Sequence, residues 1–147
     1  MFYVGLSVEP GREHVHAAFA AHAPHARLRW AEFGDDDDCA GAMFVRIERN
    51  ASEFGFLLSA TNLAGGDDYE LGLAIARTLS LALRCRTVCD GTRHGPGSNP
   101  GRCVVWIEGQ AWLGDDYHSL FYDDSPELSA EERAGLGSIK LLQRLDL

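Results

Sequence analysis

The chain has 147 residues, a length typical of a single domain, and its 46% of hydrophobic residues excludes an intrinsically disordered protein. Twenty-two acidic residues against 13 lysines and arginines give a formal net charge of −9. Such a surface would be repelled by nucleic acid and by anionic membranes, so neither is expected as a partner, whereas a basic protein would be attracted.

The first half of the chain predicts strands around one helix. Phe2–Val8 is rich in β-forming residues and is ended by Pro10 and Gly11. Apolar residues at helical spacing predict a helix over Arg12–Ala23, which Pro24 ends. Further strands are predicted over Arg27–Phe33, Ala42–Glu48 and Glu53–Ala60, the last two as a hairpin.

The stretch Asp67–Gly91 has the most regular pattern and predicts one long helix followed by a short strand. Asp67 is a good N-cap, and Glu70 follows at capping-box spacing. One helical face then carries Leu71, Ile75, Leu79, Ala82 and Leu83. A helix this apolar is expected to be largely buried, and Gly72 within it predicts close packing of a neighbouring element. Arg86–Cys89 is the strand.

The second half continues with a Gly- and Pro-rich loop, Asp90–Arg102, and a predicted strand, Cys103–Glu108. Ala111–Leu113 is a candidate short strand that pairs back after a tight turn, and Tyr117–Tyr122 is a further candidate strand. A short helix through Leu136 is predicted, capped by Ser125 or by Ser129, which has capping-box spacing to Glu132. The C-terminal segment fits either a helix or a strand. Residues 1–147 therefore predict a single α+β domain: a mostly antiparallel sheet with one long buried helix and two shorter helices packed on it.

Cysteine usage and hydropathy favour a cytoplasmic protein. No two of the four cysteines form a CxxC pair, so free buried thiols are expected in a reducing compartment, although Cys89 and Cys103 could face one another if their strands pair. The apolar start, Phe2–Val8, lacks the basic region and cleavage site of a signal peptide. No segment approaches the roughly 18 apolar residues of a membrane span.

No motif predicts catalysis, a cofactor or a metal. Asp35–Asp38 lacks the alternating oxygen ligands of a calcium loop, and Gly95–Gly101 lacks the lysine and the following helix of a phosphate loop. The histidines near the first helix miss the i, i+4 spacing of a zinc pair; they are His14, His16, His22 and His25. The sequence contains no GxSxG nucleophile motif. A non-enzymatic protein is therefore predicted.

Acidic runs in predicted loops are the candidate partner-binding residues. Solvated turns explain such runs equally simply, but an anionic patch can also occupy a basic cleft. An exposed tyrosine beside an acidic rim is typical of a protein-binding hot spot. The candidates are Asp35, Asp36, Asp37, Asp38, Arg93, His94, Asp115, Asp116, Tyr117, Asp123 and Asp124.

The segments Leu71–Thr92 and Cys103–Trp112 resemble the small cytosolic immunity proteins of bacterial polymorphic-toxin and secretion-system loci. In such proteins an Ala/Leu-rich helix enters a short strand that ends in Asp-Gly. The resemblance implies a cytoplasmic inhibitor that neutralises a cognate toxin, with an acidic surface set against a basic cleft of the toxin. It transfers no binding residue, because those surfaces vary with the toxin.

Two other functions remain open from the sequence. A small-molecule-binding or regulatory sensor domain, dimeric through an exposed sheet edge, would contain an apolar pocket under the long helix. A small metal-dependent hydrolase would use His and Asp residues of the loops. Monomer and homodimer are both compatible with the sequence.

Overall fold

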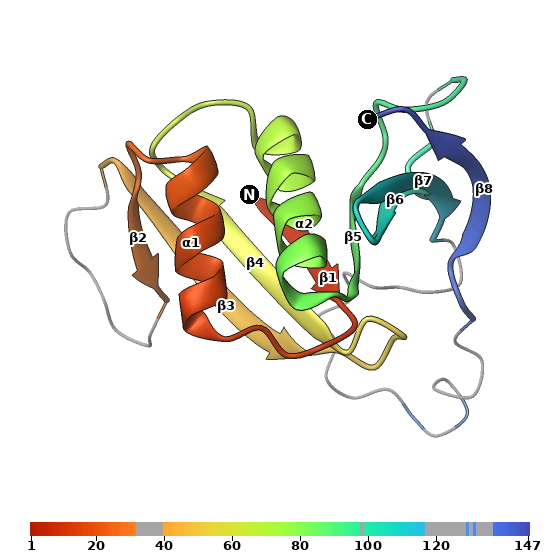
Figure 1. The fold of residues 1–147 in the computed structure, drawn as a ribbon, viewed down its shortest axis with the longest axis horizontal. Helices are drawn as coiled ribbons and strands as arrows, with labels where there is room; N and C mark the ends of the chain where they lie inside the picture. The colour runs from red at the N-terminus through yellow and green to blue at the C-terminus, as the bar shows by residue number, and fades with distance from the viewer. Residues whose placement is uncertain (32–39, 98, 117–128, 130, 132–136) are drawn as a thin grey trace.

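The computed structural model describes residues 1–31, 40–97, 99–116, 129, 131 and 137–147 (Figure 1). These residues contain two helices and one eight-stranded sheet of order β2-β3-β4-β1-β5-β6-β7-β8. The helices are α1 (Arg12–His22) and α2 (Asp68–Leu83). The strands are β1 (Phe2–Leu6), β2 (Arg27–Trp30), β3 (Ala42–Arg49), β4 (Phe56–Asn62), β5 (Arg86–Asp90), β6 (Arg102–Ile107), β7 (Gln110–Asp115) and β8 (Lys140–Leu145).

The α+β class is confirmed, but the sheet is mixed because β2 runs parallel to β3. The other six strand pairings are antiparallel. The backbone N–H of Arg27 bonds the carbonyl of Gly41 at 3.0 Å, which sets the start of β2 beside the start of β3. Side-chain alternation fits either strand direction, so the sequence did not predict this pairing.

Most predicted elements are present with shifted ends. The predicted strand Glu53–Ala60 begins only at Phe56, and the return after β6 is longer than predicted and forms β7. The C-terminal segment is a strand, β8, which pairs with β7. Three predictions lie largely or wholly outside the described residues: the Asp35–Asp38 turn, the Tyr117–Tyr122 strand and the short helix through Leu136.

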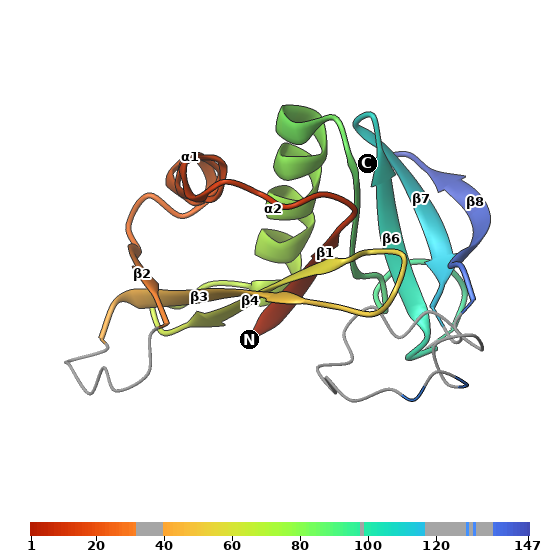
Figure 2. The ribbon, with the colours of Figure 1, turned by 90° about the horizontal axis from the view of Figure 1, so that it is seen from below.

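Both helices lie on the same face of the sheet (Figures 1 and 2). Phe2 of β1 stacks on Phe19 of α1 with ring centroids 6.2 Å apart, and His22 bonds Thr78 of α2 at 2.7 Å. Ile75 and Leu79 of α2 are fully buried, as its apolar pattern predicts. Of the other residues predicted on this face, Leu71 and Leu83 are half-buried and Ala82 is exposed. Within the described residues, neither helix is long and apolar enough to cross a membrane.

The far face of the sheet has a smaller core of its own, centred on Phe54, Leu57 and Val105. Right-handed strand twist accumulates across eight strands, and Figure 2 shows β6, β7 and β8 turned steeply away from β3 and β4. Because side chains alternate between faces, Cys89 packs under the helices and Cys103 packs on the far face. The prediction that these cysteines face one another is therefore wrong: Cys89 pairs with Val104, one residue out of register.

The predicted N-cap of α2 is confirmed. The Asp67 side chain accepts the backbone N–H groups of Tyr69 and Glu70. The helix ends at Arg84, which is left-handed with φ 48° and donates its N–H to the carbonyl of Ser80. This sharp end lets β5 begin two residues later, so the chain re-enters the sheet directly beneath the helix.

Candidate functional site

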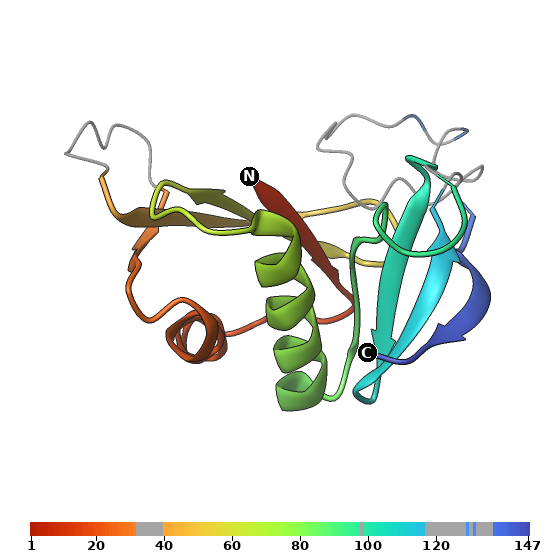
Figure 3. The same ribbon diagram turned by 90° about the horizontal axis from the view of Figure 1, so that it is seen from above.

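A cavity of about 940 Å³ opens at the amino-terminal end of α2. Its wall is built from the starts of β1 and α2, the end of β5, the loop after β5, and residues at the start of β6 and the end of β7. Figure 3 shows the amino terminus beside the first turn of α2, and Met1 lines the cavity there. Volume and mixed lining are typical of a small-ligand site or of an anchor pocket for a partner side chain.

The floor of the cavity is apolar. Phe2, Tyr3, Gly72 and Cys89 line it. Gly72 leaves room here: a Cβ on it would stand 3.4 Å from Phe2 Cδ2, which explains the close packing predicted from a glycine in the helix. Burial raises the pKa of the Cys89 thiol to about 12, so the thiol is neutral at physiological pH and belongs to the apolar floor.

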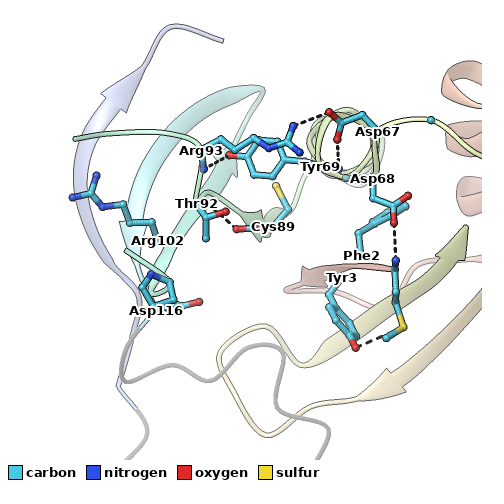
Figure 4. Close-up of a pocket in the computed structure, with 15 residues that line it drawn as sticks. Phe2, Tyr3, Asp67, Asp68, Tyr69, Cys89, Thr92, Arg93, Arg102 and Asp116 are labelled. Carbon is cyan, nitrogen blue, oxygen red and sulfur yellow. Dashed lines mark hydrogen bonds and ion pairs between the residues drawn. The ribbon is translucent and has the colours of Figure 1, made fainter. Parts of the chain in front are cut away.

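Asp67 and Arg93 form one edge of the cavity (Figure 4). Arg93 Nη1 donates to Asp67 Oδ2 at 2.7 Å, and this bond is the main reason that the pKa of Asp67 lies below its usual value. The same carboxylate caps the helix, so one side chain fixes both the first turn of α2 and the loop after β5. Both side chains are about half exposed, so the ion pair itself contributes little stability.

Tyr69 joins that edge to the loop. Its oxygen accepts the backbone N–H of Arg93 at 3.2 Å, and the Arg93 guanidinium lies 4.5 Å from the centre of its ring. Burial raises the pKa of Tyr69 to about 12, so the phenol keeps its proton, and it forms a hydrogen bond with Nδ1 of His94. The His94 ring also stacks on the phenol. The start of the loop is thus held on α2 in a defined conformation.

Asp68 is neutralised by its neighbours. Its Oδ2 accepts from the amino group of Met1 at 2.6 Å, and its Oδ1 accepts from Asn62 Nδ2 at 2.8 Å. Burial opposes ionisation, but these bonds outweigh it, and the pKa of Asp68 is lowered. Asp67 and Asp68 therefore both have compensating partners.

Asp116 differs from these two residues. It is 2% exposed, and its Oδ1 is buried with no hydrogen-bond partner among the described residues. Burial, with the negative charge of Asp115 beside it, raises the pKa of Asp116 to about 6. Arg102 also lines the cavity, but Figure 4 shows its guanidinium pointing away from Asp116, and it donates to the carbonyl of His94 at 3.4 Å. A buried carboxylate without a cation is costly, and such groups mark functional sites.

The structure brings together part of the predicted partner-binding set. Arg93, His94 and Asp116 meet around or beside the cavity, and Asp115 is the last residue of β7. The other candidates lie outside the described residues: Asp35, Asp36, Asp37, Asp38, Tyr117, Asp123 and Asp124.

Sequence reasoning missed Tyr69, Asp90 and the start of β1 as cavity residues. In the sequence, Tyr69 looks like any other residue of an amphipathic helix. Its role in the cavity wall depends on a hydrogen bond to a loop that starts more than twenty residues later. The only available signal was a polar cluster at the helix start, Asp67 and Asp68, which capping explains equally well.

The described residues offer no metal centre: no three His, Cys, Asp or Glu side chains among them are grouped so that they could hold a metal ion. Comparison of the chain with protein-family models, with curated proteins and with solved structures finds no match. Function is therefore argued from the cavity and its charges.

Proposed function

We propose that the protein is a non-enzymatic binding protein: a cytoplasmic, immunity-type inhibitor that neutralises a cognate bacterial toxin. The face around the cavity is its docking surface. One observation supports this choice. Four aspartates from three separate segments, Asp67 with Asp68, Asp90 and Asp116, line the same cavity. Folding has gathered acids from distant parts of the chain at a concave site, which suits a protruding basic group of a partner.

Electrostatics favours the same kind of partner. A net charge of −9 attracts a basic surface and speeds association, particularly at low ionic strength. Tyr69 and Arg93, at the cavity edge, belong to residue types that are enriched in binding hot spots. The Asp67–Arg93 and Tyr69–His94 contacts hold this edge in place before binding, which lowers the entropic cost of association.

The test measures binding between the purified chain and the product of the gene adjacent to its own. We expect a tight complex whose association rate falls as salt concentration rises, together with protection of bacteria that express the toxin. The Asp90→Asn variant should bind more weakly than the wild type. Glu108→Gln, an exposed residue of the β6–β7 turn, removes the same charge at the other end of β6 and should bind like the wild type.

Two results would count against the proposal. If the adjacent gene product does not bind and does not harm the cell, the immunity role fails. If a complex forms with an association rate that is insensitive to salt, or if Glu108→Gln weakens it as much as Asp90→Asn, the acidic cavity is not the docking surface.

A small-molecule sensor is a second candidate, and the cavity itself favours it. A volume of about 940 Å³ over an aromatic floor is the usual setting for a small organic ligand. A compound that binds only the folded protein would raise its Tm. At a concentration one hundred times its Kd, the compound would increase the free energy of unfolding by about 2.7 kcal/mol. A metabolite library screened by thermal shift, without any protein partner, separates this candidate from the first.

A further inference from the structure

Among the described residues, two carboxylates of the cavity lining have no cationic partner: Asp90, which is exposed, and Asp116, which is buried. Asp67 is paired with Arg93, and Asp68 with the amino group of Met1. Asp90 accepts only the backbone N–H of Thr92, at 2.9 Å, among the described residues. Asp116 Oδ1 has no donor at all within that part of the chain.

We infer that the cavity is a binding site for an organic cation, a primary ammonium or guanidinium group on an apolar stem, whose charge is neutralised by Asp116 and Asp90. The inference deepens the proposed function, on which it rests for the source of the cation: it would be a lysine or arginine side chain of the inhibited toxin. A free alkylamine has the same chemistry and is the other source.

Burial of Asp116 is the main argument for a cation. An ionised carboxylate that has left water without a partner loses its solvation, and a cation in the adjacent cavity restores part of that energy. Arg102 does not neutralise Asp116, because its guanidinium points away from Asp116 and donates to the carbonyl of His94. Four aspartates line the cavity against two arginines and the amino group of Met1, so its formal net charge is −1.

The apolar floor selects an organic cation rather than a metal ion. A metal ion needs several ligands around one point, and the described residues contain no such group of three. Phe2 and Gly72, on the helix side of the sheet, instead offer apolar lining against which an alkyl stem can lie.

The experiment titrates ¹⁵N-labelled full-length protein with three capped amino acids that differ only in the side-chain head group. N-acetyl-lysine methylamide and N-acetyl-arginine methylamide carry the cation, and N-acetyl-norleucine methylamide is the neutral control. We expect the two cations, but not norleucine, to shift the backbone amides of Gly91, Thr92 and Asp116. Asp116→Asn should weaken this binding at least about tenfold, whereas Glu108→Gln should leave it unchanged.

Either of two results overturns the inference: norleucine shifts the same amides with equal affinity, or Asp116→Asn binds the cations as tightly as the wild type. n-Butylamine, a free amine with the single charge and the alkyl stem of the lysine side chain, decides the source, because its binding more tightly than N-acetyl-lysine methylamide indicates a free amine rather than a protein side chain. Failure here would leave the inhibitor proposal intact if the toxin still binds, since the toxin could dock on the rim without entering the cavity.

Discussion

Replacing Asp116 with asparagine should stabilise the protein at neutral pH. The substitution keeps the shape of the side chain and removes a buried charge that has no partner on Oδ1 among the described residues. The folded protein raises the pKa of Asp116 from 3.8 to about 6. At about 1.36 kcal/mol per pKa unit, ionisation of Asp116 costs the folded state up to about 3 kcal/mol at pH 7.5. The neutral asparagine side chain avoids this cost, so the variant should gain stability while it loses the proposed cation site.

The stability difference between the wild type and Asp116→Asn should depend on pH. Because the folded pKa is raised, the protonated carboxyl favours folding, and this contribution is fully present below pH 3.8 and lost as pH rises through about 6. Urea unfolding of both proteins at several pH values should show equal free energies of unfolding near pH 3.5 and a growing advantage of Asp116→Asn up to pH 7.5. Equal stabilities at pH 7.5 would refute the assignment of Asp116 as an uncompensated buried charge.

Asp67→Asn is the matched control at the same cavity. Its pKa is lowered, chiefly by the bond from Arg93, so Asp67 contributes stability above its unfolded pKa that is lost as pH falls. Asparagine still caps the helix, so only the ion pair is removed. The control should therefore be slightly less stable than the wild type at pH 7.5, opposite in sign to Asp116→Asn.

Three further substitutions test the packing around the site by the free energy of unfolding in urea. Tyr69→Phe should cost about 1–3 kcal/mol because it leaves the Arg93 N–H without its acceptor; unchanged hydrogen exchange at that amide would contradict the proposed role of the phenol. Arg84→Gly should gain about 1 kcal/mol, since φ 48° favours glycine at a helix end, and any loss would show that the Arg84 side chain matters more than the backbone. Gly91→Ala should cost about 1–3 kcal/mol, because its Cβ would lie 2.5 Å from the Cys103 carbonyl carbon, and an unchanged midpoint would refute that close approach.

The long helix shows which structural features can be predicted from local sequence pattern. Its cap at Asp67, the burial of Ile75 and Leu79 and the strand that follows were predicted, because each depends on residues within a few positions of one another. The predicted face was not fully correct, since Ala82 is exposed at the end of the helix. The hairpin of β6 and β7 was predicted for the same reason. The parallel pairing of β2 with β3 was not, since strand direction depends on the path of the chain between the strands rather than on their side chains.

The acidic character of the protein, its α+β class and the candidate loops follow from the sequence alone, because composition and periodicity are local properties. The cavity follows only from the tertiary structure. Its residues come from β1, the start of α2, the end of β5 and the end of β7, and only sheet order brings these segments together. The sequence predicted Asp67 as a helix cap and Asp116 as one of several acidic loop residues. Only the fold shows that Asp116 is buried, with no partner for Oδ1 in the described part of the chain, and that Asp67 and Asp68 are paired with cations.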